Sequence, residues 1–513
     1  SAGQSFPADN MLSIGYNSFT GISDAAILVS SDYSASTTKL KALCNWYDNI
    51  TGPTITGNTG ASGGVINAPA GKVSFANWLN YGTDASPNLG FQLPTSLTLS
   101  PGSNTSVAEN HYRVLSNGIG CLVSNQTLTL SGTFDFANAT AMAEWAKGNN
   151  QIAGDGMGII TGSGDDYSIT APDSTNNVTI TAASLGSATV RGPGDLAVVA
   201  LESPLYFNNN NATSSFQNWT ISNLVFKDFD MTIGCDLNGG NTTAYNNLKI
   251  LNNQIDIPED RNQTFGGETS NFQNIGIYLG FGSNMEISGN NINIDGVGIS
   301  DGTNYSVSVA IQSTTSGGTV YDGLKIKNNT VTVTGDPDAV APSVIRGFWE
   351  NGHNKNAAIE LSGNKFLNAN ASNTADLNRQ TAFWVTSRSG AAKKVEYKNN
   401  EVSGFNEGIA WMGGAYTLYT PPDYEADATP VEIKNNTFDK NKNSVVVRKS
   451  LTSPNAGSPG YIENNSFTNA VTGGFAIKNE GTGDAQSVCN WYGTTSAPVA
   501  ATMNNGPVYL ASI

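Results

Sequence analysis

Charged residues are scarce in this chain. They make up 13% of the 513 residues, roughly half the share of an average soluble domain. The 25 Lys and Arg residues form no basic run, which argues against nucleic acid as a partner because phosphate contacts need clustered cations. The chain also lacks any run of about 18 apolar residues, so no membrane span is predicted.

Histidine and cysteine are almost as rare. The chain has 2 His and 4 Cys, and none of them forms the close pairs that bind zinc, so we expect no transition-metal site and no cofactor. No signal peptide is visible. The chain opens with Ser-Ala-Gly instead of Met, and we therefore interpret it as a mature or excised segment.

Asparagine, by contrast, is abundant, at 63 residues. Disorder is an unsuitable explanation, because 38% of the residues are hydrophobic. Seven segments share one pattern, of which Leu324–Val331 (LKIKNNTV) and Val431–Phe438 (VEIKNNTF) are examples. An asparagine recurs in them every 29 to 38 residues, with one looser member before them, at Asn223, Asn253, Asn291, Asn329, Asn364, Asn400, Asn436 and Asn465.

Each repeat has the same internal order. Apolar and polar residues alternate over three or four positions, which is the period of a half-buried strand. An Asn-Asn pair then marks a tight bend, because Asn tolerates left-handed backbone angles. A second short strand follows, and a third apolar run such as Val307–Ile311 comes later. Three strands and their connections predict one coil of an all-β solenoid.

These residues resemble the right-handed parallel β-helix repeats of pectate-lyase-like proteins, over about residues 215–480. The resemblance implies coils of about 29–38 residues with loops on one side. It also implies that the recurring asparagines stack from coil to coil and hydrogen-bond one another, which would satisfy buried polar groups. The competing interpretation is a set of solvated turn asparagines with no ladder.

The rest of the chain divides around this core. Residues 1–90 form an end module and residues 91–125 a β connection. Residues 126–214 hold the first coils and a capping helix, predicted at 137–147, which would cover the exposed end of the solenoid. Residues 215–480 are the β-helix core. Residues 481–513 repeat the end module.

The two end modules match in sequence. Asn17–Thr20 and Asn465–Thr468 both read NSFT, and Cys44–Tyr47 and Cys489–Tyr492 both read CNWY. The second motif resembles the Asn-Trp-Trp-Gly ending of secreted bacterial and archaeal β-helix surface proteins, where it closes a β-helix. Two interpretations remain open: the modules join tandem units or subunits end to end, or they are an internal duplication that packs on its own chain.

The cysteines follow the same duplication. Cys44 and Cys489 occupy matched positions, and we favour buried thiols in matched core sites for them. The alternative is a disulfide or an assembly link to Cys121, Cys235 or a neighbouring subunit.

An enzyme on this scaffold would act on a polysaccharide, as a lyase or a glycoside hydrolase. Hydrolysis needs two facing carboxylates, and a lyase needs a base together with a cation or Ca²⁺. Asp228 and Asp230 lie two apart on an expected strand, and Arg261 is the basic residue of this candidate set. We favour solvated loop residues over a catalytic site for this set.

Aromatic residues recur in the third strand of the repeat. Trp349, Trp384 and Trp411 lie in segments that look equivalent, each after a Phe or Ala, and Tyr419 lies in the longest loop. Because neighbours on a strand point to opposite faces, one column should lie inside and one outside. We favour a core stack over a carbohydrate-binding platform for the tryptophans.

The sequence as a whole favours an extracellular structural protein without catalysis. It would be an adhesin segment or a self-assembling subunit of a surface layer, sheath or filament, with copies of itself as partners. The alternative is a polysaccharide lyase or glycoside hydrolase that binds carbohydrate along the loop side.

Overall fold

The computed structural model describes residues 14–511 except for 102–110, 137–166, 236–244, 259–272, 296–306, 335–343, 370–378, 386–394, 413–430, 449–460, 494–503 and several shorter stretches. The chain forms two compact units. Unit 1 comprises Ser1–Asn208 with Asn223–Phe229, and unit 2 comprises Asn209–Ser222 with Asp230–Ile513. Among the described residues, no helix is long and apolar enough to cross a membrane.

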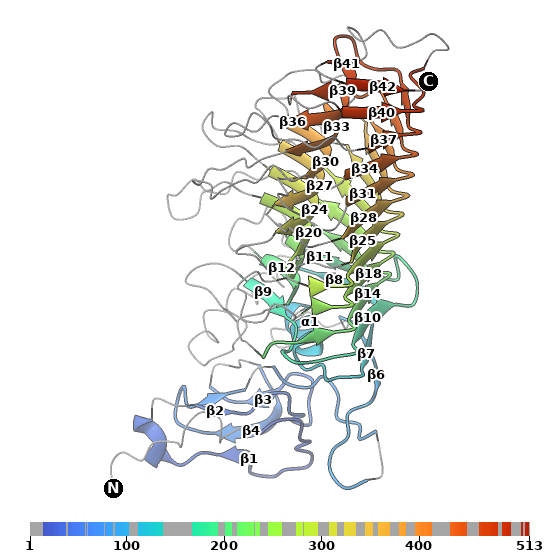
Figure 1. The fold of residues 1–513 in the computed structure, drawn as a ribbon. Coiled ribbons are helices and arrows are strands. Elements are labelled where there is room, and N and C mark those ends of the chain that lie inside the picture. The colour runs from blue at the N-terminus through green and yellow to red at the C-terminus, as the bar shows by residue number, and fades with distance from the viewer. Residues whose placement is uncertain are drawn as a thin grey trace, which may run out of the picture. The chain divides into compact units, whose positions relative to one another are not determined.

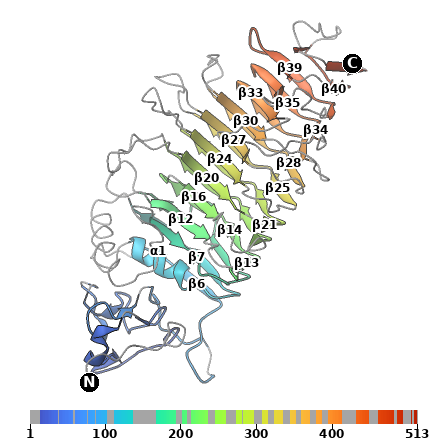
Figure 2. The same cartoon turned by 60° about the vertical axis from the view of Figure 1, so that its left-hand side comes forward.

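Unit 2 is built from parallel strands in three stacked sheets, which Figures 1 and 2 show as successive arrows. The first sheet contains β14 (Thr220–Ser222), β18 (Lys249–Leu251), β22 (Glu286–Ser288), β25 (Leu324–Lys327), β28 (Ile359–Ser362), β31 (Val395–Lys398), β34 (Val431–Lys434), β37 (Tyr461–Glu463), β40 (Ala485–Val488) and β42 (Val508–Ala511). The second contains β19 (Gln254–Ile257), β23 (Asn291–Ile294), β26 (Thr330–Val333), β29 (Lys365–Asn368), β32 (Glu401–Ser403), β35 (Thr437–Asp439) and β38 (Ser466–Thr468).

The third sheet has longer strands. It contains β16 (Met231–Cys235), β20 (Gln273–Leu279), β24 (Val307–Thr314), β27 (Val344–Asn351), β30 (Arg379–Val385), β33 (Glu407–Met412), β36 (Asn443–Arg448), β39 (Phe475–Asn479) and β41 (Asn504–Asn505). A small sheet of β13 (Phe216–Gln217), β17 (Tyr245–Asn246) and β21 (Gly282–Ser283) accompanies them. Consecutive strands of one sheet come from consecutive coils, which confirms the predicted parallel β-helix solenoid.

Equivalent residues stack in register along each sheet. In the first sheet Ile287 pairs with Ile326, and Ile326 pairs with Leu361. All three are fully buried, while the polar residues that alternate with them are partly exposed. The period-two pattern of the sequence thus becomes columns of apolar side chains in the interior, and the burial of these columns is what stabilises the unit.

Unit 1 contains the earlier coils. One sheet orders β6 (Ser96–Leu99), β7 (Thr127–Leu130) and β10 (Thr179–Ala182), a second orders β8 (Gly132–Asp135), β11 (Ala188–Arg191) and β15 (Val225–Lys227), and a third pairs β9 (Tyr167–Thr170) with β12 (Leu201–Phe207). The N-terminal end module adds β1 (Ala25–Leu28), β4 (Gly63–Asn67) and β3 (Pro53–Thr54) in one sheet, β2 (Leu40–Lys41) paired with β5 (Val73–Ser74), and a 3₁₀ helix at Ser31–Ala35.

The helix of unit 1 differs from the sequence-based prediction. The predicted helix at 137–147 lies outside the described residues. The structure has helix α1 at His111–Gly120, inside the segment that was predicted to be a β connection, and that assignment is therefore wrong for these residues. Tyr112, Leu115 and Ile119 give α1 a buried face with helical spacing. The helix was not predicted from the sequence because it contains Ser116, Asn117, Gly118 and Gly120, which all have low helix propensity.

Candidate functional site

A continuous asparagine ladder runs through unit 2. In each step the backbone N and the side-chain Nδ2 of one asparagine donate to Oδ1 of the next, over 2.8 to 3.0 Å. Each Nδ2 also donates to a backbone carbonyl of the preceding coil, as from Asn364 to Ile326. The members are Asn253, Asn290, Asn329, Asn364, Asn400, Asn436, Asn465 and Asn490.

Two of the predicted ladder positions are wrong. In the coil at 285–292 the ladder member is Asn290, which is 1% exposed, and Asn291 is the exposed first residue of β23. Gly289 takes the left-handed bend position, with φ +69°, where other repeats have the first asparagine. Asn223 is itself such a bend residue, with φ +59°, and buried Leu224 follows it.

The sequence reasoning also missed ladder members in the CNWY motifs. Asn490 ends the ladder of unit 2. In unit 1, the backbone N and Nδ2 of Asn17 both donate to Oδ1 of Asn45 over 3.0 Å, and Asn45 Nδ2 donates to the Ile14 carbonyl. The missing signal was that Cys can take the place of the bend asparagine, because Cys44 and Cys489 have φ +55° and +54°.

The two end modules therefore have the same structure as well as the same sequence. The ring of Phe19 stacks on that of Tyr47 with centroids 5.5 Å apart, and Phe467 stacks on Tyr492 at 5.4 Å, both at 23°. Burial raises the pKa of both tyrosines, an effect that hydrogen bonds from their neighbours partly oppose.

Backbone pairing repeats with the same register. Leu40 of β2 pairs with Val73 of β5, and Ala485 of β40 pairs with Val508 of β42. Isolated bridges join Ser18 to Trp46 and Ser466 to Trp491. We refer to residues 14–80 and 461–511 as the N-terminal and C-terminal end modules.

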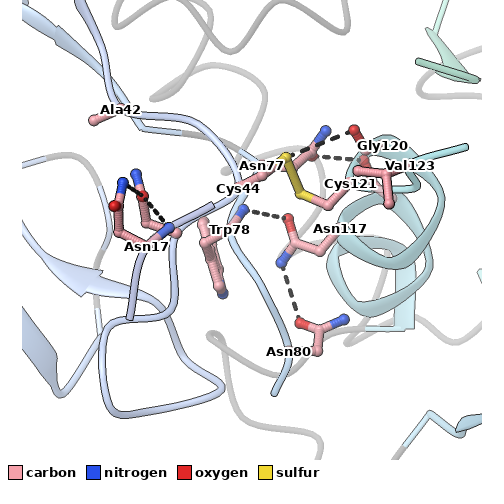
Figure 3. Close-up of a disulfide and its surroundings, with 12 residues drawn as sticks. Asn17, Ala42, Cys44, Asn77, Trp78, Asn80, Asn117, Gly120, Cys121 and Val123 are labelled. Atoms are coloured by element: carbon pink, nitrogen blue, oxygen red, sulfur yellow. Dashed lines mark hydrogen bonds between the residues drawn. A yellow bond between two sulfur atoms is a disulfide. The ribbon is translucent and has the colours of Figure 1, made fainter. Parts of the chain in front are cut away.

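The modules differ in what covers their last coil. In the N-terminal module Cys44 forms a disulfide with Cys121, just after helix α1, with Cα atoms 5.4 Å apart (Figure 3). The Trp78 backbone N donates to Asn117 Oδ1 of α1 over 3.3 Å. A Cβ on Gly82 would lie 2.1 Å from Trp46 Nε1, so the backbone covers this indole closely. The N-terminal module thus packs on its own chain, as the duplication interpretation predicts.

In the C-terminal module the corresponding residues are exposed in the part of the chain that the structure describes. Cys489 is an exposed free thiol, and Trp491 is 45% exposed, whereas Cys44 is 5% exposed. The prediction of buried thiols in matched sites is therefore wrong: Cys44 is in a disulfide, which was the alternative, and Cys489 faces solvent. Cys235 is a buried thiol.

Tryptophans lie on the outer face of the third sheet. Phe348 and Phe383 pair in register and are fully buried, and Phe383 contacts the ring of Phe366 at 4.2 Å inside the solenoid. Their neighbours Trp349 and Trp384 pair on the opposite face. The expected inner and outer columns are confirmed. Trp384 is 6% exposed and packs in a buried cluster with Ala410 and Val446, against which Trp349 also packs, so these two tryptophans form a packed stack on the face opposite the phenylalanines and not an exposed platform.

An arginine holds these two indoles together. The guanidinium of Arg346 lies 4.2 Å from each ring, over Trp349 and over Trp384, and it is 7% exposed. Trp411 does not belong to this column, because it pairs with Val385 while Ala410 pairs with Trp384. Tyr419 lies outside the described residues. The guanidinium and the two indoles thus form a packed cation–π cluster on this face of the sheet.

The predicted acidic set is only partly described. Asp228 Oδ2 accepts a hydrogen bond from Arg191 Nε over 2.9 Å, within unit 1. This bond raises the pKa of Arg191. Asp230 and Arg261 lie outside the described residues, so the structure does not bring this set together. No group of three or more His, Cys, Asp or Glu side chains that could hold a metal ion occurs within the described ranges.

No family model matches the chain, and no curated protein matches it. Three solved structures align with most of its length. The Agl-KA catalytic domain is 12% identical, with a TM-score of 0.33 and coverage of 83% of this chain and 70% of that one. A mannuronic acid specific polysaccharide family 6 lyase from human gut microbiota is 11% identical, with a TM-score of 0.28 and coverage of 82% and 91%.

The third structure is the catalytic unit of a GH87 α-1,3-glucanase from Streptomyces thermodiastaticus strain HF3-3, which is 12% identical with a TM-score of 0.28 and coverage of 83% and 71%. The names of the last two describe a polysaccharide lyase and a glucanase. At these identities and scores the likeness carries no argument about what this chain does.

Proposed function

We propose that this protein is a structural subunit of an extracellular assembly, in which the ends of the β-helix join copies of the chain. The observation that supports this function is the pair of end modules. The two modules share a ladder bond and a ring stack as well as a sequence motif. A repeated end module favours association between copies, because the strand edges at the end of a solenoid pair readily with another chain.

An extracellular location agrees with the cysteine chemistry. The Cys44–Cys121 disulfide links residues 77 positions apart, and such links persist in oxidising compartments. A surface with few charges also suits contact between copies, because little charge has to be desolvated when two such surfaces meet.

Light scattering over a concentration series tests the proposal. The purified full chain should grow from single subunits to elongated particles as its concentration rises. Truncation after residue 480 would remove the C-terminal module strands β40, β41 and β42 and should prevent growth. A matched control carries Trp219→Phe, which alters a fully buried indole and leaves the C-terminal module intact. A wild-type chain that stays a single subunit at every concentration would contradict the proposal.

A second candidate function, carbohydrate binding or cleavage along the loop side, is favoured by one observation. Arg346 between Trp349 and Trp384 offers a cation beside two indole rings, which are groups that bind acidic sugars. Binding or cleavage of an acidic polysaccharide by the wild-type chain, lost in Arg346→Gln and kept in Lys440→Gln, would establish this function. No binding by the wild-type chain would dismiss it.

A further inference from the structure

We propose that Asn328 is a glycosylation site, where the side-chain amide carries an N-linked oligosaccharide in the exported protein. This inference rests on the extracellular location within the proposed function and not on assembly. The acceptor sequence Asn-X-Ser/Thr, called a sequon, occurs 14 times in the chain, close to the number that chance gives for so much Asn, Ser and Thr. The sequon alone therefore selects no site, and the surroundings of each asparagine decide.

The two asparagines of this repeat have opposite surroundings. Asn328 is the bend residue between β25 and β26, with φ +53°, and it is exposed. Asn329 beside it has no solvent exposure and donates to Asn364 Oδ1 and to the Ile287 carbonyl. An oligosaccharide needs solvent around the amide that carries it. The bend position can therefore hold one, and the ladder position cannot.

The hydroxyl that completes the sequon lies on the same side of the chain as Asn328. Thr330 is the first residue of β26 and is partly exposed, while Asn329 between them points inward. No residue in the described ranges hydrogen-bonds the Asn328 side-chain amide. The bend thus presents an open acceptor amide together with the hydroxyl that recognition of the sequon requires.

Glycine lies beside this bend on both neighbouring coils. The backbone N of Asn328 donates to the Ser362 carbonyl, one residue before Gly363. On the preceding coil, the backbone N of Gly289 donates to the Lys327 carbonyl. A Cβ added to Gly363 would lie 2.4 Å from Asn328 Oδ1, so the amide extends over this glycine. Two neighbours without side chains leave room for a saccharide.

Other bend sequons have an asparagine beside them instead. Asn177 Nδ2 donates to Asn125 Oδ1 over 2.9 Å, which ties two sequon asparagines together. Asn435 and Asn464 begin sequons on adjacent coils, whose strands pair in register. A saccharide on one member of either pair would meet the other member. Asn328 has no such neighbour, and we therefore select it.

The modification is a group transfer without oxidation or reduction. An oligosaccharyltransferase supplies the saccharide as a lipid-linked sugar pyrophosphate. Nδ2 of Asn328 attacks the anomeric carbon of the sugar, so that an N–C bond forms. The C–O bond to the pyrophosphate breaks, and its electron pair leaves on the phosphate oxygen. The amide gives up one of its two protons to a base of the transferase.

Glycopeptide mapping of the full chain tests the site. The chain is exported by a eukaryotic secretory host that has this transferase, digested with trypsin, and treated with a glycan amidase in heavy-oxygen water, which converts glycosylated Asn to labelled Asp. The fragment Asn328–Arg346 contains no asparagine besides Asn328 and Asn329. We expect the label at Asn328 only. A digest without amidase controls for spontaneous deamidation. A label at Asn329, or an unlabelled fragment, would overturn the assignment.

Variants of the hydroxyl position sharpen the result. Thr330→Val keeps a branched side chain on the strand and should lower the occupancy of Asn328 at least about tenfold, because the hydroxyl is lost. Thr330→Ser keeps the hydroxyl and should stay modified. Glu401→Thr completes a sequon at Asn399, an exposed bend with φ +56°, and should add a saccharide there. Wild-type Asn399 is the matched control and should stay bare. Unchanged occupancy in Thr330→Val would refute the role of the sequon.

Glycosylation and assembly can fail independently. An exported chain that forms particles while Asn328 stays bare would refute this inference and leave the structural function standing. A chain that carries the saccharide and remains a single subunit at every concentration would support the site and refute assembly.

Discussion

Paired asparagines in this chain do two different things, and the difference explains why only part of the ladder could be predicted. The first of each pair sits at the bend with positive φ, as Asn399 does at +56°. The second, such as Asn400, is buried and bonds the neighbouring coils. Both positions favour Asn in the sequence, so a repeat that reads Gly289-Asn290-Asn291 could be aligned in two ways, and only the structure shows which residue is buried.

These two roles predict that substitutions at the bend position and at the ladder position change the stability by very different amounts. Asn364→Ala removes two accepted and two donated side-chain hydrogen bonds from a site with no solvent exposure, and should cost about 3 kcal/mol of stability because buried partners lose their bonds. Asn399→Gly, at an exposed bend, should change stability by less than about 0.5 kcal/mol. Hydrogen exchange of the amides in β28 and β31 would report both. Equal effects would contradict the assignment.

The buried tyrosines of the end modules predict a loss of stability in alkali. Burial raises the pKa of Tyr47 and Tyr492 above the ordinary value of 10.0. The folded chain therefore holds protons that the unfolded chain releases above about pH 10, and the free energy of unfolding falls as the pH rises through this range. Below it the contribution is complete.

The melting temperature measured from pH 8 to pH 12 tests this effect. It should fall above about pH 10 in the wild-type chain. Tyr47→Phe and Tyr492→Phe should flatten the fall, because phenylalanine has no proton to lose. A fall of the same size in both variants would mean that other groups are responsible.

At the scale of the element, the third sheet depends on small residues that no repeat pattern revealed. Gly347 pairs beside Ala382, and a Cβ on Gly347 would lie 2.2 Å from the ring of Phe366 and 2.6 Å from the Ala382 carbonyl. Gly408 is similarly crowded, because a Cβ added there would lie 2.4 Å from the Ser444 carbonyl oxygen. The strand approaches the interior closely here, which lets Phe366 and Phe383 meet.

Enlarging this position should therefore destabilise unit 2. Gly347→Ala should cost about 1–3 kcal/mol, since the added methyl group has to displace a packed ring or backbone. Gly347→Ala should cost less stability when it is introduced into the Phe366→Leu variant than into the wild-type chain. The smaller side chain at position 366 leaves room for the added methyl group. Thermal unfolding of the four proteins gives the coupling. Additive effects would show that Gly347 and Phe366 do not share the space.

Helix α1 and its disulfide form the other element whose role emerged only from the structure. The link closes a long loop, with a sequence separation of 77. Cys121→Ser should lower the stability of unit 1 by about 2–5 kcal/mol. A limited-proteolysis time course should show faster cleavage in residues 14–136 of the variant and an unchanged rate in unit 2. An unchanged rate in both parts would mean that α1 is held by its noncovalent contacts alone.

At the scale of the whole molecule, the sequence predicted the solenoid because periodic patterns repeat in every coil and reinforce one another. It could not predict which cysteines pair, since four cysteines allow several connectivities. Nor could it place Trp384 on the outer face, because alternation assigns neighbours to opposite faces without saying which face is inside. Those features depend on contacts between residues far apart in the chain, such as Cys44 with Cys121.

The most direct measurement is electron microscopy of the purified full chain over a range of concentrations, with class averages of the particles. We expect particles that contain several joined subunits, and the number of subunits in a particle should rise with the concentration. Single, unjoined particles at every concentration would contradict the central claim that this β-helix is an assembly subunit.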